Sequence, residues 1–565
     1  MPPNQKLASD FPLFCASSDD VQHRLPDFFQ NRLTSPDEAF ASAFEAGRYR
    51  QNRGFVAQIG AQILDPASPA FELLDNQRAA FALCRAVVND TFAAARTGAL
   101  TKKVVIITGP PGSGKSAIAA RLWASLVTDP DLPEGDVVFT TTSMSQNSNW
   151  SHLFNQVGGH NAARGVVRKA TAYSPISLHT LKQLRLRRGE QFLAPSNDWR
   201  RNLAALRAVV GAFRDGADDN QNLVTVVDEA HALINPEDPR VRGQFGFPTS
   251  LGPQAYHIIR SSLLTVFLLD PQQGFRQREN TTLDDLREWS QEVGAGKPEE
   301  ISLEGMQFRC AGSAEFVAWL ESFLRVPRVG GTTPAPPEPT AAEALRAYSL
   351  ITSSPDLSLG DSRMDLRVFD NPENLEAALR QRHLDGYTVR LLSTFSRRWK
   401  TQDDADPHGV PPEFMDFHEP YELNGETRYW SRVWNVLGPR DDYTWYVTGH
   451  PAGHIARDPL CEVGCTYAVR GFDYDYVGIL WLNDLVWRDN RWRIDPAAVA
   501  ETGVADLVRL ARNEAESGRP DAKPTVQLLH RVAQAYRILF TRALRGVYVW
   551  VPDAETRAHL VASIR

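Results

Sequence analysis

The chain has 565 residues, of which 42% are hydrophobic and 23% are charged, and its formal net charge is −7. This composition argues against extensive disorder, the length suggests about three domains, and the net charge gives no global signal for nucleic acid. The five cysteines favour a reducing compartment over a disulfide framework. The sequence has no signal-peptide pattern and no apolar run of membrane-spanning length, so we expect a cytoplasmic protein that does not bind a membrane.

Residues 1–70 show no clear strand periodicity, and we predict that they form a short, mostly helical accessory segment. From about residue 74 onward, short apolar runs alternate with longer helical patterns, which is typical of an α/β fold with parallel sheets. We divide this part into a first core domain, 71–298, and a second, 299–565, with a Pro-rich loop at 326–340. The strands expected in the first domain are 104–108, 137–141, 223–227 and 264–269, and those expected in the second are 301–303, 366–369, 389–393, 476–482 and 547–551.

The first strand pattern is followed by a glycine-rich loop and then by a helical pattern. The loop reads Gly-Pro-Pro-Gly-Ser-Gly-Lys-Ser, and its glycines let successive backbone N–H groups point at one anion. Lys115 would reach the β- and γ-phosphates of a nucleotide, and Ser116 would offer its hydroxyl to Mg²⁺. A chance match is disfavoured because the strand and the helix flank the loop as a P-loop requires. The residues expected to hold the phosphates are Gly109, Pro110, Pro111, Gly112, Ser113, Gly114, Lys115 and Ser116.

Two later strand patterns of the first domain end in polar residues. The strand 223–227 runs into Asp228 and Glu229. After a P-loop, Asp228 would hold Mg²⁺, and Glu229 would orient and help deprotonate the attacking water, although such a pair alone is often a helix N-cap. The strand 264–269 runs into Asp-Pro-Gln-Gln, where Gln273 could sense the γ-phosphate, although this motif is also an ordinary turn.

Charge and metal-ligand patterns add two weaker candidates. Between residues 160 and 201, the sequence contains nine basic residues and two acidic ones, so the local net charge is +7. This segment is either a polyanion contact or the solvated faces of one or two helices. Cys461 and Cys465, with His450 and His454 nearby, form a weak zinc candidate because their spacing is irregular.

Beyond the P-loop, an ordered set of short motifs carries a family resemblance. The set comprises Asp-Glu-Ala-His at 228–231, Asp-Pro-Gln-Gln at 270–273, Gln-Phe-Arg at 307–309, Arg-Gly-Phe-Asp-Tyr-Asp at 470–475 and Thr-Arg-Ala at 541–543. In this order the chain resembles superfamily 1 helicases and, more closely, bacterial proteins with a Schlafen group 3-like DNA/RNA helicase or ATPase domain. The resemblance covers roughly residues 70–560. It implies two RecA-like P-loop NTPase core domains, ATP hydrolysis with Mg²⁺ between them, and single-stranded DNA or RNA as a partner.

The resemblance also assigns expected roles to single residues. Gln77 stands where the family reads the adenine edge, and Arg309 and Arg542 stand where two arginines of the second core domain reach the γ-phosphate. The planar, permanently charged guanidinium suits that role, although either arginine alone could be a surface ion pair. Gly471 would permit a tight turn near the nucleotide or the nucleic-acid backbone. Asp473 departs from the glutamate of many relatives, so the ribose or coupling contacts at this position are not carried over.

The sequence leaves two function classes open. The leading hypothesis is a nucleic-acid-dependent ATPase, a helicase or translocase, with the basic segment 160–201 near the nucleic-acid track. The alternative is an ATP-driven switch or sensor without unwinding activity, in a nucleic-acid defence or repair complex with a partner nuclease or another defence-system protein. The departure at Asp473 and the lack of a large strand-separating insertion favour the alternative. A small-molecule kinase is the weakest interpretation because it leaves the second domain unexplained.

Overall fold

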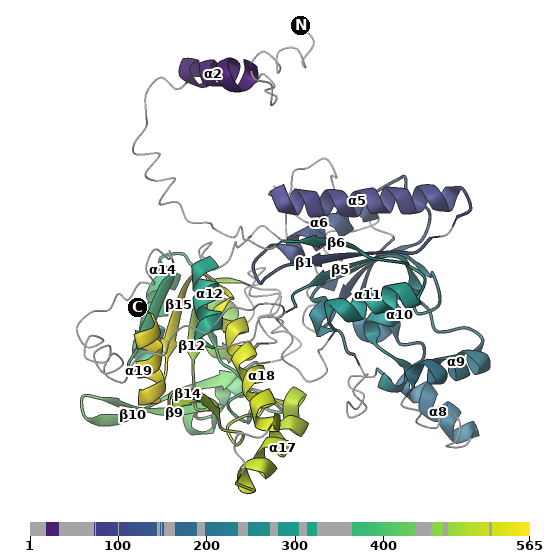
Figure 1. Cartoon of the computed structure of the whole chain (residues 1–565). Coiled ribbons are helices and arrows are strands. Elements are labelled where there is room, and N and C mark those ends of the chain that lie inside the picture. Colours follow the sequence, from purple (N-terminus) through teal and green to yellow (C-terminus); the bar gives the residue numbers. More distant parts are fainter. Residues whose placement is uncertain are drawn as a thin grey trace. The chain divides into compact units, whose positions relative to one another are not determined.

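The computed structural model comprises two compact units, Met1–Tyr49 and Arg50–Arg565. In the first unit, the helix η1 (Asp20–Arg24) continues into α2 (Leu25–Arg32) (Figure 1). The described part of the predicted accessory segment is therefore helical. The structure describes residues 19–32, 73, 75–99, 101–143, 147, 150–151, 164–188, 198–235, 247–271, 281–303, 314–324, 364–436, 454–466, 473–518 and 523–564.

The second unit contains two sheets, and the first of them is a parallel sheet of six strands in the order β3-β2-β4-β5-β1-β6. Its strands are β1 (Lys103–Thr108), β2 (Asp136–Thr141), β3 (Gly165–Lys169), β4 (Asn222–Val227), β5 (Ser262–Leu269) and β6 (Glu299–Ser302). The strands predicted at 104–108, 137–141, 223–227 and 264–269 are confirmed as β1, β2, β4 and β5. The helices of this first core are α5 (Asp75–Arg96), α6 (Lys115–Val127), η3 (Ala170–Tyr173), α8 (Leu178–Arg188), α9 (Trp199–Val210), η4 (Ala230–Ala232), η5 (Thr249–Leu251), α10 (Gln254–Ser261) and α11 (Leu283–Glu292).

Both faces of the first sheet are buried, which explains why its central strands are continuous apolar runs. Because side chains alternate along a strand, Val105 and Ile107 of β1 pack in the cluster that contains α5 and α6. Val104 and Ile106 pack in a second cluster with α10 and α11. Figure 1 shows these two pairs of helices on opposite sides of the sheet. The glycine-rich loop therefore leaves a strand that is fixed from both sides.

One strand assignment and the domain boundary that depends on it are wrong. The strand predicted at 301–303 was placed in the second domain, but β6 pairs in parallel with β1, with Ile301 beside Ile107. The amide of Leu303 also donates to the carbonyl oxygen of Thr108 at 2.8 Å. The first core therefore extends at least to residue 303, beyond the predicted boundary at 298. Four residues of the pattern Glu-Glu-Ile-Ser carry too little apolar periodicity to show which sheet they join.

The second sheet has seven strands in the order β7-β15-β12-β8-β11-β10-β9, and all neighbours are parallel except the hairpin β9-β10. Its strands are β7 (Asp365–Phe369), β8 (Val389–Leu392), β9 (Phe417–Leu423), β10 (Glu426–Trp434), β11 (Glu462–Gly464), β12 (Tyr474–Leu480) and β15 (Ala543–Trp550), and β13 (Leu485–Arg488) and β14 (Arg491–Ile494) form a separate hairpin. The strands predicted at 366–369, 389–393, 476–482 and 547–551 are confirmed as β7, β8, β12 and β15. The helices are α12 (Ala314–Phe323), η7 (Pro407–Gly409), η8 (Pro412–Phe414), α14 (Pro372–Leu384), α16 (His454–Arg457), η9 (Thr502–Val504), α17 (Ala505–Glu516), α18 (Lys523–Phe540) and α19 (Ala554–Ser563). No helix in the described ranges is long and apolar enough to cross a membrane.

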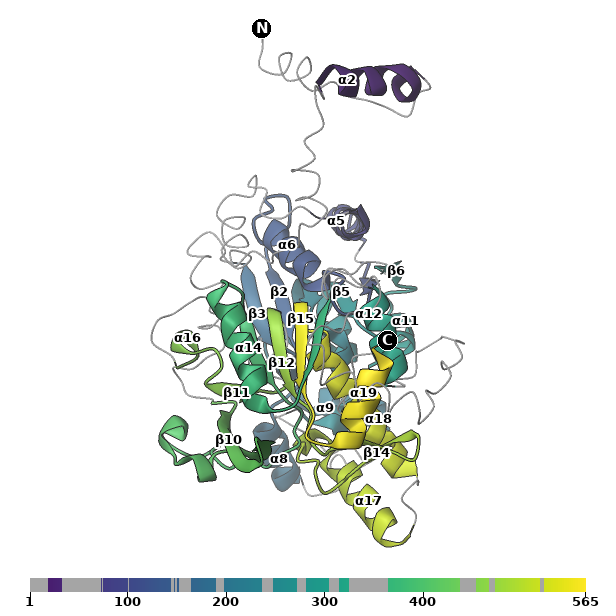
Figure 2. The same cartoon turned by 90° about the vertical axis from the view of Figure 1, so that its left-hand side faces the viewer.

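Helices cover both faces of the second sheet as well. On one face α14 lies so close to β12 that a Cβ at Gly478 would come within 2.5 Å of Cδ1 of Leu379. On the other face, Val477 and Ile479 of β12 pack with residues of α12, α17 and α18. Figure 2 shows α14 on one side of β12 and β15, with α12 and α18 on the other. The α/β fold with two mainly parallel, helix-covered sheets is thus confirmed.

A buried ion pair ties β8 to β11 in this core. Arg390 donates to Oε1 of Glu462 at 2.5 Å, and both side chains are fully buried. We expect Glu462→Ala to lower the free energy of unfolding by about 3–5 kcal/mol because it leaves a buried guanidinium without its counter-charge. The measurement is urea unfolding of both proteins, with Asp506→Ala as the control.

Asp506 forms an exposed pair with Arg509, and both side chains are 64% exposed. Its loss should cost less than about 1 kcal/mol. Equal effects of the two substitutions would contradict a structural role for the buried pair.

Candidate nucleotide-binding site

The glycine-rich loop connects β1 to α6 and has the backbone conformation of an anion-binding loop. Gly112 and Gly114 adopt positive φ angles of 84° and 83°, which residues with a Cβ rarely adopt. At Gly109, an added Cβ would lie 2.6 Å from Oγ of Ser113, so the loop closes tightly on itself. Helix α6 begins at Lys115 directly after this turn, and its free N–H groups therefore point into the loop.

The side chain of Lys115 folds over the loop. Its Nζ donates to the carbonyl oxygens of Gly109 at 2.6 Å and Pro110 at 2.9 Å, and the residue is 9% exposed. These contacts hold the ammonium group beside the backbone N–H groups of the loop. A phosphate chain bound there would meet one positive charge and a helix N-terminus together.

Ser116 and Asp228 meet, as the sequence predicts. Oγ of Ser116 lies 3.2 and 3.1 Å from the two carboxylate oxygens of Asp228, which directly follows β4. Burial, and then the charge of Glu229, raises the pKa of Asp228 to about 7. A hydroxyl and a buried carboxylate are oxygen ligands that suit Mg²⁺, and a divalent cation would offset the cost of burying this charge. Ser116 and Asp228 therefore fit the predicted magnesium site, with water and phosphate oxygens as further ligands.

Glu229 is held in an unusual conformation by its neighbours. Its φ and ψ angles of 56° and 46° are left-handed, which costs a non-glycine residue about 1–2 kcal/mol. The residue is 8% exposed, and its Oε2 lies 3.2 Å from Nε2 of His231. The backbone amide of Asp270 donates to Nδ1 of His231 at 3.4 Å. Because Nδ1 accepts this bond, the ring hydrogen of a neutral His231 is on Nε2. This N–H donates a hydrogen bond to Oε2 of Glu229.

His231 thus joins the end of β4 to the end of β5. It positions the carboxylate of Glu229, and no role was assigned to it from the sequence. The signal was present, because His231 is the last residue of the Asp-Glu-Ala-His motif. What the sequence could not show is its contact with the amide that begins Asp-Pro-Gln-Gln.

Gln77, on helix α5, lies against the glycine-rich loop. Its Nε2 donates to the carbonyl oxygen of Ser113 at 3.1 Å, and the side chain is largely buried. The structure therefore brings Gln77 to the nucleotide-binding loop. Its contact with the adenine edge stays a prediction.

The role of Gln77 can be tested by comparing nucleotides. If Gln77 reads adenine, Gln77→Ala should weaken ATP binding by about fivefold and GTP binding much less, because one hydrogen bond is worth about 1 kcal/mol. The measurement is the Kd of each nucleotide, with the exposed Asn76→Ala on the same helix turn as the control. An equal loss for ATP and GTP would mean that Gln77 only supports the loop.

In the second core, Asp473 and Arg542 lie side by side. Nη1 of Arg542 is 3.9 Å from Oδ1 of Asp473, and the arginine side chain is 1% exposed. The amide of Tyr474 donates to the carbonyl oxygen of Arg542 at 3.0 Å, which ties the first residue of β12 to the residue before β15. Both predicted site residues therefore sit at the amino ends of these strands, whereas the first-core residues lie at carboxyl ends.

Several predicted residues cannot be placed. Gln273, Arg309 and Gly471 lie outside the described residues. His450, one of the four residues of the zinc candidate, also lies outside the described residues. Within the described ranges, no group of three or more His, Cys, Asp or Glu side chains could hold a metal ion.

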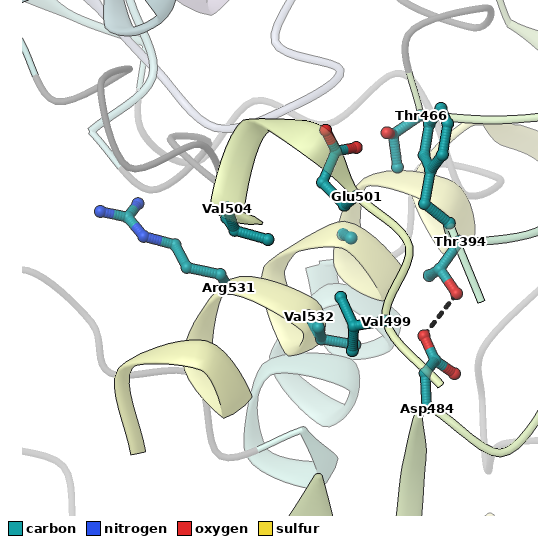
Figure 3. Close-up of a pocket in the computed structure, with 10 residues that line it drawn as sticks. Thr394, Thr466, Asp484, Val499, Glu501, Val504, Arg531 and Val532 are labelled. Atoms are coloured by element: carbon teal, nitrogen blue, oxygen red, sulfur yellow. Dashed lines mark hydrogen bonds between the residues drawn. The ribbon is translucent and has the colours of Figure 1, made fainter. Parts of the chain in front are cut away.

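A small cavity in the second core is not a nucleotide site. It has a volume of about 20 Å³, which is room for about one water molecule. Figure 3 shows Thr394 donating to Asp484, and the bond is 2.6 Å long. The hydroxyl of Tyr536 donates to the other oxygen of Asp484 at 2.6 Å, so this buried carboxylate is satisfied within the core.

Residues 102–553, four fifths of the chain, match the family model of the Schlafen group 3, DNA/RNA helicase domain. The chain belongs to this family. The Schlafen group 3 chain is 20% identical over 353 residues to the uncharacterized protein YPL245W of Saccharomyces cerevisiae, a match that covers 60% of this chain and 64% of the yeast protein.

Solved helicase structures are also similar to parts of this Schlafen group 3 chain. A crystal structure of Pif1 helicase from Candida albicans matches with a TM-score of 0.24 and 13% identity over 55% of each chain. S. cerevisiae Dbp5 bound to RNA and ADP BeF3 matches with a TM-score of 0.26 and 12% identity over 82% of each chain.

Proposed function

We propose that this chain is a nucleic-acid-dependent ATPase, a superfamily 1-like DNA/RNA helicase or translocase. The observation that carries the proposal is the meeting of Ser116, Asp228 and the His231-bound Glu229 beside a complete phosphate-binding loop. Membership of a DNA/RNA helicase family supports nucleic acid as the partner that the ATPase serves.

In this proposal, the residues of the first core divide the chemistry of hydrolysis among them. Lys115 and the loop N–H groups bind the β- and γ-phosphates, and Ser116 and Asp228 hold Mg²⁺. The bound ion would supply charge stabilisation at the phosphate oxygens. Glu229 orients the attacking water and accepts its proton at the carboxylate, while the Nε2–H of His231 keeps that carboxylate in place.

Residues of the second core and of the loop after β5 complete the proposed site. Arg309 and Arg542 stabilise the charge on the transferring phosphoryl group, and Gln273 senses the γ-phosphate. Gly471 and Asp473 lie near the nucleotide or the nucleic-acid backbone. The support for Arg542 is its position beside Asp473, which keeps a buried guanidinium at a strand end.

The test is steady-state ATP hydrolysis with Mg²⁺, titrated separately with single-stranded DNA, single-stranded RNA and duplexes. Lys115→Ala is the blank, because it removes the phosphate-binding cation. Strong stimulation of ATP hydrolysis by one of the single strands supports the proposal and shows whether the protein acts on DNA or RNA. A rate of ATP hydrolysis that no nucleic acid changes would contradict the proposal. It would favour an ATP-driven switch that acts with a protein partner.

A further inference from the structure

The first core carries an appendage between β3 and β4. Helices α8 and α9 pack there around a small apolar cluster of their own, which includes Leu181, Trp199, Leu203 and Leu206. Figure 1 shows the two helices together at the end of this core that is opposite to α5. The described part of the predicted basic segment 160–201 lies in β3, η3 and this appendage.

Helix α8 exposes one face that carries the cations Lys182 and Arg187. His179, Lys182, Gln183 and Arg187 are exposed, and Leu186 between them is 78% exposed. Because these positions recur at intervals of three and four residues, they lie along one side of the helix. The opposite side is anchored, since Leu181 is buried in the apolar cluster and Leu184 packs against it.

Three cations of α8 have no counter-charges among the described residues. Lys182, Arg185 and Arg187 form no ion pair there, and α8 contains no acidic residue. The neighbouring helix α9 behaves differently, because Arg200 holds both carboxylate oxygens of Glu292 at 2.8 and 2.7 Å. Like charges three residues apart, such as Lys182 and Arg185, destabilise a helix by a few tenths of a kcal/mol. An external anion would therefore stabilise α8.

We propose that α8 anchors the phosphate backbone of duplex nucleic acid next to the motor core, an inference that rests on the proposed function. The helix of 11 residues is about 16 Å long, enough to follow the phosphates of about half a duplex turn. Single-strand sites combine cations with stacking aromatics, and the exposed face of α8 has no aromatic ring except His179. A membrane surface fits less well, because the apolar side of α8 is already packed in the core of the appendage.

The test compares two triple variants with the same change in net charge. Lys182→Gln, Arg185→Gln and Arg187→Gln remove the unpaired cations of α8. The control replaces three other cations of the first core by Gln: Arg200 on the neighbouring helix α9, and Arg287 and Lys297 away from the appendage. Both arginines are paired with glutamates. Affinities for blunt DNA and RNA duplexes of one sequence are measured between about 50 and about 200 mM salt.

The α8 variant should bind duplex at least about tenfold more weakly, with a salt slope that is shallower by about 2–3, because each lost phosphate contact removes about 0.9 from the slope. The control should keep the affinity and the slope of the wild type. Comparison of the affinities for the DNA duplex and the RNA duplex shows which of the two the protein binds more tightly. The single substitution Lys182→Glu, at an exposed position, repeats the test if the triple variant unfolds.

Two results would overturn the inference while the proposed function stands. One is wild-type duplex affinity and slope in the α8 variant. The other is an equal loss of duplex binding and of single-strand-stimulated ATP hydrolysis, which would make α8 part of the single-strand track. Failure of the proposed function is a separate result, because it would appear as wild-type hydrolysis that no nucleic acid stimulates.

Discussion

Glu229→Gln should reduce ATP turnover to background, by about a thousandfold or more, while ATP binding is retained. Glutamine has nearly the same shape as glutamate, and its amide oxygen can still accept the bond from Nε2 of His231. The substitution therefore keeps the local geometry and removes only the group that takes a proton from water. The measurements are phosphate release at saturating ATP and the Kd of ATP for both proteins.

Lys115→Ala provides the comparison for this prediction. It should abolish turnover together with tight ATP binding, because Lys115 neutralises phosphate charge in the bound state as well as in the transition state. If Glu229→Gln turns over ATP at a rate near that of the wild type, Glu229 is not the base. If it loses ATP binding as completely as Lys115→Ala, its role is structural.

Arg542→Ala should slow ATP hydrolysis by on the order of a thousandfold and leave nucleotide affinity largely intact. A guanidinium that contacts the phosphoryl group mainly in the transition state contributes to kcat much more than to binding. Single-turnover hydrolysis, measured beside the Kd of ATP, separates the two effects.

Since Arg542 is buried beside Asp473, its removal could also destabilise the second core, and Arg545→Ala controls for this. Arg545 is a buried arginine of β15 that pairs with Asp475 at 2.9 Å. Its loss should lower the unfolding temperature without changing kcat of the folded protein. Addition of Asp473→Asn to Arg542→Ala should recover stability but not hydrolysis. Recovery of hydrolysis in that double variant would show that Arg542 serves only to neutralise Asp473.

Much of the site could be predicted because its motifs are local in sequence. The loop at 109–116 and the pair Asp228 and Glu229 each follow a strongly apolar strand, and parallel strands bring such ends to one edge of a sheet. The contact of His231 with the amide of Asp270 could not be predicted, since it joins segments 39 residues apart. The burial of Arg542 beside Asp473 depends likewise on the pairing of β12 with β15.

The fold could also be predicted only in part, because long apolar strands have a clear sequence pattern and short edge strands do not. The strands β3 and β6, at the two edges of the first sheet, are short and partly or largely exposed, so their patterns were missed or assigned to the wrong domain. The hairpin β9-β10 has a local signal in the sequence, the pair Asn-Gly at its turn. Asn424 and Gly425 both have positive φ angles, 54° and 81°, in the two-residue turn that Asn-Gly favours.

The most direct test of the account is the coupling between ATP and nucleic acid in the Glu229→Gln protein, where bound ATP is not consumed. The Kd of a labelled single strand is measured with and without saturating ATP and Mg²⁺. We expect ATP to change that Kd by about 5- to 150-fold, and the strand to change the Kd of ATP by the same factor, because coupling is reciprocal. An identical strand affinity in both conditions, for DNA and for RNA, would contradict a motor that drives nucleic acid with ATP.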